Sequence, residues 1–552
     1  MSSARPKGKQ PRPDKTPRDG LLIATWILSA TIVLVTVFVR IRLLHMPLER
    51  DEGEFAYVGQ LILKGIVPFK IAYNMKLPGI YAVYALIMAI FGQTDTGIRI
   101  GLLLANLATA VLVFALARRL WNTQLALIAA ASYPVLTLSR AVIGLAAHAT
   151  QFQMPMVVGG VILLLKALES DRRSLLFLSG LLMGLAFITK QHAILFVAFG
   201  GCYLLWELIR SRTLARPAIV KRAAVYTLGA VIPFAVVCIT VLAAGVFGKF
   251  WFWTFTYAHQ YTTEMPVPSG LFLLRAMCVQ GAGYIAALEA LAAVGLLAVW
   301  CDRKLRPRAV LVTGFLLSGF LATAPGLYFR EHYFVMMMPA MSLLIGASVM
   351  WIGQLLSRLR FAPVLRFVPL LLFLAAVAQV MIVSREVFFE STLIRASRLT
   401  YGASPFPESI TVAEYIKERT SPDDKIAVLG SEPQIYFYAD RLSATGYLYT
   451  YGMAEKQPYA LRMQQEMSNE IEAAKPKYIV YVNVGGSWLF RSWSDRWILT
   501  WFAKYASAHY KVVGLADIIS GETTNYYWGG EADYFAPDSE EGLVIFERRP
   551  DR

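Results

Sequence analysis

Carboxylates and cations lie beside long apolar runs at four separate places in the sequence. The residues concerned are Asp51 with Glu52, then Lys76, then Lys190, and finally Arg330 with His332 and Tyr333. A partly desolvated carboxylate with a raised pKa can take a proton from a hydroxyl group, and separated cations suit a phosphate. Together these residues predict a phosphate pocket beside a general base, held at the surface of a bilayer.

Each candidate also has an ordinary structural explanation. Carboxylates favour helix N-termini, so the acidic pair could cap the following stretch 55–62, whose apolar spacing predicts a helix lying on the membrane. A lone lysine such as Lys76 usually extends its ammonium group to water, and Glu331 could neutralise Arg330. Lys190 is harder to explain, because it stands between two apolar runs on the side where the positive-inside rule disfavours lysine.

Four further residues are weaker candidates for contacts with a sugar or an acceptor, namely His148, Gln151, Trp253 and Tyr257. The aromatic run 251–257 could stack on a sugar. Tryptophan and tyrosine are enriched at membrane interfaces in general, so an interfacial belt is the favoured explanation. No histidine has the spacing of metal ligands, and the sequence predicts neither a metal nor another cofactor.

The elements that position these residues are predicted to be membrane helices. The 552-residue chain is 57% hydrophobic and 16% charged, which excludes a single soluble domain. Lys and Arg outnumber Asp and Glu by 53 to 37, but in short clusters between apolar runs rather than in a nucleic-acid-binding surface. The four cysteines form no C-x-x-C, so neither a disulfide framework nor a zinc site is indicated.

Eleven apolar runs predict membrane spans, at 20–39, 99–117, 122–139, 152–168, 174–189, 193–209, 223–246, 279–300, 309–324, 334–357 and 367–384. The run 78–92 is only about fifteen residues long, and a run that short more often lies in the interface. If the run 78–92 lies on the membrane surface and does not cross it, five basic clusters face the cytoplasm, and only Arg40 and Arg42 violate the positive-inside rule. The chain is therefore predicted in the cytoplasmic (inner) membrane, with its N-terminus in the cytoplasm.

Composition divides the chain into three predicted parts. Residues 1–19 form a polar, basic and disordered tail, and residues 20–384 form a transmembrane catalytic domain whose first outer loop is 41–98. Residues 385–552 form an extracytoplasmic α/β domain, with strands at 425–429, 478–484, 510–515 and 542–546 and helices at 408–419 and 458–474. The predicted fold class is thus a polytopic α-helical membrane protein with a C-terminal soluble α/β domain.

Motifs of several other enzyme classes are absent from the sequence. It contains no G-x-x-x-x-G-K-[ST], no H-E-x-x-H and no G-x-S-x-G, so ATP hydrolysis, zinc proteolysis and serine hydrolysis lack their motifs. No D-x-D occurs, so a nucleotide-sugar site with a bridging metal is unsupported.

Five pieces, in their order along the chain, resemble the bacterial integral-membrane glycosyltransferases of the GT-C class. They are Asp51-Glu52-Gly53, Lys76-Leu77-Pro78, the stretch 184–191, Arg330 to Tyr333 with the following 338–340, and the stretch 429–437. The resemblance is to the dolichyl-phosphate-mannose protein mannosyltransferase-like group (glycosyltransferase family 39), to which the lipid A aminoarabinose transferases are related. It covers most of the chain.

This resemblance implies a GT-C-like fold of about 11 transmembrane helices and sugar transfer from a polyprenyl-phosphate donor to an acceptor hydroxyl, with inversion, on the outer face. It assigns the catalytic base to Asp51 and a supporting carboxylate to Glu52. It assigns the binding of the leaving phosphate to five residues, namely Lys76, Lys190, Arg330, His332 and Tyr333. Glutamine stands at 151, where many relatives carry an acid, which again argues against an essential metal.

The sequence alone does not exclude two other functions. A transporter or flippase of lipid-linked glycans would show charges in the middle of its spans and internal symmetry, and a non-catalytic relative would only bind a glycan. The expected partners are membrane lipids, the lipid-linked donor and an acceptor that is a lipid, a polysaccharide or a protein, with no nucleic acid.

Overall fold

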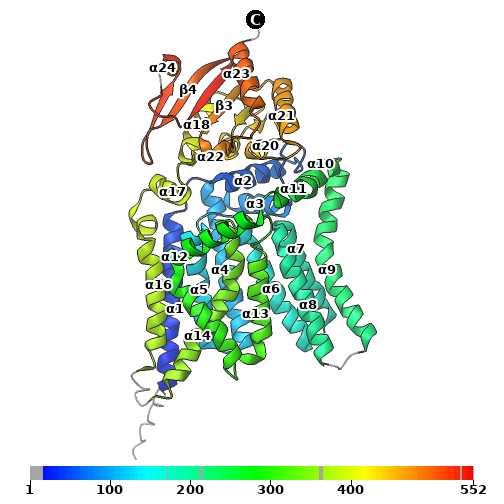
Figure 1. The fold of residues 1–552 in the computed structure, drawn as a ribbon, viewed down its shortest axis with the longest axis vertical. Helices are drawn as coiled ribbons and strands as arrows, with labels where there is room; N and C mark the ends of the chain where they lie inside the picture. Colours follow the sequence, from blue (N-terminus) through cyan, green and yellow to red (C-terminus); the bar gives the residue numbers. More distant parts are fainter. Residues whose placement is uncertain (1–16, 171, 212–214, 360–364, 535–536, 551–552) are drawn as a thin grey trace, which may run out of the picture.

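The computed structural model describes residues 17–170, 172–211, 215–359, 365–534 and 537–550, and the predicted disordered tail at 1–19 lies outside these ranges up to residue 16. Figure 1 shows a long bundle of helices with a smaller domain of strands and helices at one end. The predicted fold class, a polytopic helical protein with a C-terminal α/β domain, is confirmed.

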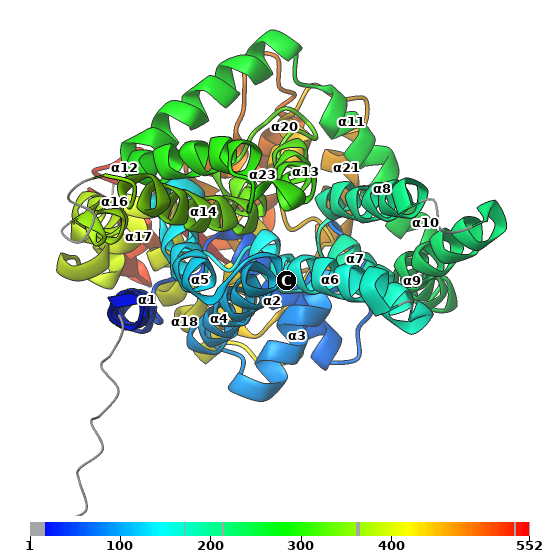
Figure 2. The same cartoon turned by 90° about the horizontal axis from the view of Figure 1, so that it is seen from below.

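All eleven apolar runs predicted to span the membrane are helices of the bundle. They are α1 (Pro17–Arg42), α4 (Asp95–Leu120), α5 (Thr123–Leu138), α6 (Ala149–Ser170), α7 (Arg173–Thr189), α8 (Ile194–Ser211), α9 (Arg216–Ala243), α12 (Val267–Cys301), α13 (Ala309–Leu321), α14 (Met338–Leu356) and α16 (Val368–Val383). Seven of the described helical segments are long and apolar enough to cross a membrane. The count of eleven spans and their orientation stay predictions. Seen from below (Figure 2), α9 lies at one edge of the bundle and α1 and α16 lie at the opposite edge.

The two arginines that violate the positive-inside rule bind backbone carbonyls at the end of α1. Arg40 is buried and donates to the carbonyls of Gly144 and Thr137, each 3.1 Å away. Arg42 donates to the carbonyl of Val387 at 3.3 Å. Both guanidinium groups therefore join α1 to neighbouring segments, which accounts for cations at this end of the first helix.

The C-terminal domain is built on a six-stranded mixed sheet in the order β2-β1-β3-β6-β4-β5. Its strands are β1 (Lys425–Leu429), β2 (Leu442–Ser443), β3 (Tyr478–Asn483), β4 (Tyr510–Ile518), β5 (Thr524–Trp528) and β6 (Gly542–Arg548). β1 is parallel to β2 and β3, and the other neighbours are antiparallel. All four predicted strands are present. The two that sequence patterns missed are the edge strands, a two-residue β2 and a half-buried β5.

Helices cover this sheet and connect it to the bundle. They are α17 (Leu393–Tyr401), α18 (Phe406–Glu418), α19 (Gln434–Ala439), α20 (Tyr451–Ala454), α21 (Ala460–Ala474), α22 (Gly485–Trp488), α23 (Trp497–His509) and α24 (Gly530–Tyr534). The predicted helices at 408–419 and 458–474 correspond to α18 and α21, whereas α23 was not predicted. Two short helices, α10 (Phe247–Trp251) and α11 (Ala258–Thr263), flank a π-helical turn at Phe252–Tyr257 beneath the domain.

The first outer loop contributes two helices, α2 (Arg50–Leu63) and α3 (Gly79–Phe91), at the junction between the bundle and the domain (Figure 1). The prediction that α2 lies on the membrane surface is wrong, because residues 52–61 are all buried. The reason is close packing against α19, where a Cβ atom added at Gly53 would lie 2.6 Å from the backbone nitrogen of Gln434. The acidic start of α2 is therefore enclosed between two parts of the protein.

Candidate active site

The N-terminus of α2 is capped by Glu49 and Glu52, which leaves Asp51 free for other contacts. The Glu49 carboxylate accepts from the backbone N–H of Glu52 at 2.8 Å, and the Glu52 carboxylate accepts from that of Glu49 at 3.0 Å. This reciprocal pair is a capping box, which satisfies backbone donors at a helix start. The explanation of the acidic pair as a helix cap therefore holds for Glu52 and not for Asp51.

Asp51 accepts two hydrogen bonds on one oxygen, and its other oxygen faces His148. Its Oδ1 lies 2.7 Å from Lys76 Nζ and 3.0 Å from the Tyr449 hydroxyl, which donates to it. Its Oδ2 lies 3.6 Å from His148 Nδ1. Lys76 also binds Glu54 Oε2 at 2.5 Å, so this lysine is held between two carboxylates.

The electrostatic state of Asp51 differs from the sequence-based expectation of a raised pKa. Burial raises the pKa of this carboxyl, but the charges of Lys76 and His148 lower it more, and the net pKa lies well below the usual range. Asp51 is therefore ionised at neutral pH. Its side chain is 21% exposed, so a substrate hydroxyl can reach it.

Glu52 has a different environment from its neighbour. It is fully buried and accepts from the Arg99 guanidinium at 2.9 Å and from the backbone N–H of Ala147 at 2.7 Å. Together with the capping bond, these contacts tie α2 to α4 and to the segment before α6. The Glu52 carboxylate thus holds the helix that carries Asp51 rather than facing the same space.

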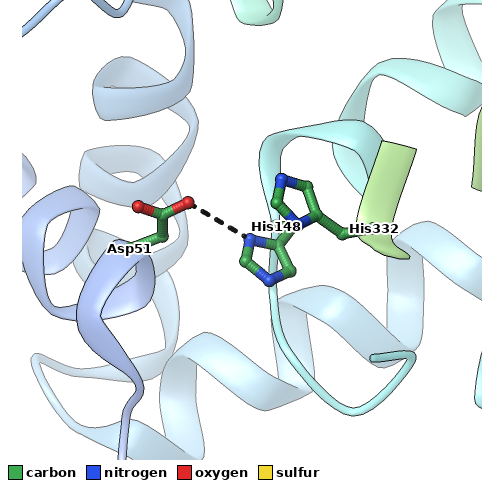
Figure 3. A group of neighbouring side chains, drawn as sticks. All are labelled: Asp51, His148 and His332. Atoms are coloured by element: carbon green, nitrogen blue, oxygen red, sulfur yellow. Dashed lines mark ion pairs between the residues drawn. The ribbon is translucent and has the colours of Figure 1, made fainter. Parts of the chain in front are cut away.

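His148 and His332 lie beside Asp51 as a stacked pair, shown in Figure 3. Their ring centroids are 4.0 Å apart and their planes differ by 12°. One ligand atom from each histidine and one from Asp51 all lie within 4.8 Å of one another, so the three side chains could hold a metal ion. Burial lowers the pKa of His148, but Glu49 and Asp51 raise it more, so a metal would have to displace a proton here.

Lys190 supplies a buried cation on the same side of the site, and the charges of Asp51 and Glu54 act on it. It is buried, and its ammonium lies 4.8 Å from the Tyr333 ring centroid. Among the residues that the structure describes, the ammonium group has no hydrogen-bond or ion-pair partner. Burial lowers its pKa to about 8. The ring of His192 lies 4.6 Å from Tyr333, and both of its nitrogens are buried without a partner in the described ranges.

Arg330 lies further out, at the edge of this cationic region. It is exposed, and its guanidinium carbon lies 5.4 Å from the Tyr328 ring centroid. Within the described residues it forms no ion pair with Glu331, so simple neutralisation by that neighbour does not account for it. His332 and Tyr333, two and three residues after Arg330, bring the same segment into contact with the site, and their ring centroids lie 4.7 Å apart.

Three of the weaker candidates lie outside this immediate cluster. Gln151 is buried in the bundle, where its side chain accepts from Asn106 at 3.4 Å and donates to the carbonyl of Gly144 at 3.5 Å. Trp253 and Tyr257 pack beneath the C-terminal domain, where the Tyr257 hydroxyl donates to Glu455 at 2.9 Å. His148, by contrast, belongs to the cluster itself.

Sequence reasoning missed the residues that the C-terminal domain brings to the site. Tyr449 binds Asp51 directly, and Arg50 forms a 2.8 Å ion pair with the fully buried Glu432. No local pattern marks either contact, since each joins positions almost four hundred residues apart. Glu54 could have been found, because it lies three positions after Asp51 and therefore on the same face of a helix.

The comparisons with known proteins agree with this architecture. Residues 76–237 match the family model described as dolichyl-phosphate-mannose-protein mannosyltransferase. A search of curated protein sequences finds no match. Among solved structures, the chain is similar to ArnT from Cupriavidus metallidurans bound to undecaprenyl phosphate, with a TM-score of 0.57, 15% identity, and coverage of 94% of this chain and 97% of that one.

Two oligosaccharyltransferase structures from Archaeoglobus fulgidus are also similar. The apo enzyme gives a TM-score of 0.53 at 12% identity over 96% of this chain and 76% of that one. The enzyme in complex with an inhibitory peptide and a dolichol-phosphate gives 0.51 at 13% identity over 97% and 77%. The resemblance identified in the sequence is thereby confirmed: the chain has the fold of the GT-C glycosyltransferases and, over residues 76–237, matches the dolichyl-phosphate-mannose-protein mannosyltransferase family.

Proposed function

We propose that the chain transfers a sugar from a polyprenyl-phosphate donor to an acceptor hydroxyl, with inversion at the anomeric carbon. Residues 20–384 are the catalytic unit in the cytoplasmic membrane, and residues 385–552 lie on its outer face. The observation that carries the proposal is an ionised carboxylate, Asp51, near a buried lysine, Lys190, that has no partner in the described structure. The undecaprenyl phosphate bound by ArnT and the dolichol-phosphate bound by the archaeal enzyme support a donor of this class.

In this proposal Asp51 accepts the proton of the acceptor hydroxyl on Oδ2, since Lys76 and Tyr449 already occupy Oδ1. The hydroxyl oxygen attacks the anomeric carbon, and the bond from that carbon to the phosphate oxygen breaks with its electron pair. The proton then passes to Asp51. A carboxylate with a lowered pKa is a weak base, so proton transfer follows the start of carbon–oxygen bond formation, when the attacking oxygen has become acidic.

Negative charge grows on the phosphate as it leaves, and Lys190 is suited to bind it. Because this lysine has no partner to give up, its attraction to the developing charge is not offset by the loss of another ion pair. Arg330 provides a second cation at the exposed edge, and His332 and Tyr333 add hydrogen-bonding groups between them. Removing one such contact typically costs about 3–4 kcal/mol of transition-state stabilisation.

Two residues that the resemblance assigns to chemistry receive positioning roles here. Lys76 is held by Asp51 and Glu54, so it orients the base and keeps it ionised rather than binding the phosphate. Glu52 is enclosed by Arg99 and backbone donors, so it holds the start of α2 in place. Both residues therefore position the Asp51 carboxylate.

The test replaces Asp51 by asparagine in the full-length protein reconstituted in lipid nanodiscs. Transfer of a radiolabelled sugar from synthetic undecaprenyl-phosphate hexoses and pentoses into cell-envelope extract is measured. A general base typically contributes about 10²–10⁴-fold to the rate, so Asp51→Asn should lose that much while remaining folded. Asp440→Asn is the matched control, because this exposed aspartate has a left-handed backbone (φ 52°) that asparagine also tolerates.

Two outcomes would contradict the proposal. Transfer at the wild-type rate by Asp51→Asn would remove this residue from the mechanism. Tight binding of the lipid-linked sugar by the wild-type protein, with no release of sugar to any acceptor or to water, would instead favour a non-catalytic glycan-binding protein. Mass analysis of envelope glycans with and without the protein would then identify the acceptor or confirm its absence.

A further inference from the structure

We propose that a second cavity, separate from the Asp51 site, binds an uncharged saccharide. The cavity lies where the bundle meets the C-terminal domain, between the end of α2, the segment that joins α3 to α4, and helices α18 and α19. It encloses about 430 Å³, and small-molecule sites typically measure about 300–1,000 Å³. Saccharide binding here goes beyond the proposed sugar transfer and does not depend on it.

The cavity lies on the opposite face of α2 from the reactive carboxylate. Gln60 lines the cavity and follows Asp51 by nine positions in the same helix. Nine residues make about two and a half helical turns, so the two side chains point to opposite sides and lie about 13 Å apart along the axis. Asp51 contacts Lys76 and His148, neither of which lines the cavity. A ligand in the cavity would therefore leave the candidate active site unoccupied.

Gln60 gives the cavity a buried amide that is only half satisfied. The residue is 3% exposed, and its Nε2 donates to Gln93 Oε1 at 3.1 Å. Its Oε1 is buried without a hydrogen-bond partner among the described residues. Turning both amides over would exchange donor and acceptor and still leave one polar atom of Gln60 unpaired. A buried polar group without a partner is costly, so a ligand hydroxyl that pairs with this amide is favoured.

Two further groups of the cavity are suited to hydroxyls. Asp95 Oδ1 accepts from the backbone N–H of Thr96 at 2.6 Å, and its Oδ2 accepts no hydrogen bond within the described residues. The Tyr438 hydroxyl accepts from the backbone N–H of Leu48 at 2.9 Å and has no acceptor for its own proton in the described part of the chain. With the Gln60 amide, the cavity thus offers both acceptors and donors. A sugar hydroxyl needs both, because it donates one hydrogen bond and accepts others.

The charges around the cavity balance, which favours an uncharged ligand. Asp440 at the rim is already paired with Lys64, whose Nζ lies 2.6 Å from its Oδ1, so this pair takes no part in the proposed binding. The other two charges are the Asp95 carboxylate and the exposed Lys417 ammonium, which have opposite signs. A ligand of either sign would be repelled by one of them. Ile410 adds apolar surface to the lining, which suits the C–H groups of a sugar ring.

The test measures binding of neutral disaccharides to the full-length protein in nanodiscs, by saturation-transfer NMR and by calorimetry. The probes are maltose, cellobiose, lactose and diacetylchitobiose. At least one of them should bind, and Gln60→Leu and Asp95→Asn should each raise its Kd about tenfold, because each removes a hydrogen bond to the ligand. Gln93→Ala, at an exposed position of the lining, should also weaken binding and keeps the test valid if Gln60→Leu does not fold.

Three control variants should bind the disaccharide as the wild type does. Gln434→Leu matches Gln60→Leu, because Gln434 is also fully buried, donates to Ser409 at 3.0 Å and has an unpartnered oxygen in the described structure, but does not line the cavity. Asp423→Asn matches Asp95→Asn at an exposed position outside the cavity. Asp51→Asn should lose sugar transfer and keep disaccharide binding, which separates this inference from the proposed function. Melting temperatures show whether each variant is folded.

A further arm identifies the source of the saccharide. Nanodiscs that contain a neutral diglycosyl diacylglycerol are compared with nanodiscs that lack it, and weaker binding of the free disaccharide in the first would show that a lipid-borne saccharide occupies the same cavity. Equal Kd values for the wild type, Asp95→Asn and Gln93→Ala would overturn the cavity as the binding site. Failure of the wild type to bind any of the disaccharides would overturn the saccharide assignment, and so would binding of inorganic phosphate or ethanolamine in their place.

Discussion

Affinity for a polyprenyl-phosphate sugar should fall as pH rises from 7 to 9, because Lys190 loses its proton in that range. Burial lowers the pKa of this lysine to about 8 in the empty site. A sugar phosphodiester carries one negative charge throughout the range, so the donor itself does not titrate. The protonated lysine is the binding form, and attraction by the phosphate raises its pKa in the complex. The affinity for the donor is therefore at its full value well below pH 8 and decreases progressively as the pH rises above 8.

The size of the effect follows from linkage. If only the protonated form binds the donor, the apparent Kd is multiplied by 1 + 10^(pH − 8). This factor is about 1.1 at pH 7 and about 11 at pH 9, so the donor should bind about tenfold more weakly at the higher pH. Burial raises the pKa of Glu49 to about 7. Measurements between pH 7.5 and 9.5 therefore follow the titration of Lys190 rather than that of this carboxyl.

The assay is equilibrium binding of a short-chain fluorescent polyprenyl-phosphate sugar to the protein in nanodiscs, measured across this pH range. Lys190→Arg keeps the positive charge at every pH tested, because a guanidinium does not titrate below about pH 12, so its affinity should be independent of pH. Lys190→Met should bind weakly at every pH. A wild-type Kd that is constant from pH 7.5 to 9.5, or a Lys190→Arg variant with the wild-type slope, would refute the assignment of the phosphate to Lys190.

Three further predictions concern the contacts that hold the base. Glu432→Gln leaves the Arg50 guanidinium without its buried partner and should lower thermal stability by about 3–5 kcal/mol, unless Arg50→Met is made as well. Tyr449→Phe keeps the ring but removes the donor to Asp51, so kcat should fall about tenfold or more with an unchanged melting temperature. Gly53→Ala places a methyl group against the α19 backbone and should destabilise the protein by about 1–3 kcal/mol in denaturant or thermal unfolding.

The helical bundle could be predicted from the sequence because length and apolarity are local properties. Every one of the eleven apolar runs is a helix, and four buried, β-branched runs of the C-terminal part are strands. The edge strands were missed because β2 has only two residues and β5 has no alternation of buried and exposed positions. Helix α23 was missed although its buried residues Ile498, Phe502 and Ala506 recur at every fourth position. The position of α2 was predicted wrongly for a different reason: its apolar stripe predicts burial against something, but does not distinguish a membrane surface from α19.

The candidate site could be predicted only as far as residue types and neighbours in the sequence allow. Asp51 and Lys190 stand out because their charges lie at the ends of apolar runs. Which partner neutralises each charge depends on the fold, so the ion pair of Lys76 and the lowered pKa of Asp51 could not be inferred. Tyr449 lies in a domain that carries no recognisable chemical motif, and its contact with the base depends on how that domain docks.

The docking of the C-terminal domain places its side chains in contact with the start of α2, which carries Asp51. The domain binds α2 through the buried pair of Arg50 with Glu432 and through the Tyr449 hydroxyl, on either side of the position that carries the base. A buried ion pair contributes little net stability but is costly to break, so it favours one geometry over others. A protein that only moved a lipid across the bilayer would need its polar groups along the path through the bundle. Here the polar groups of the candidate site converge where the bundle meets the C-terminal domain, which is the arrangement that the proposed transfer requires.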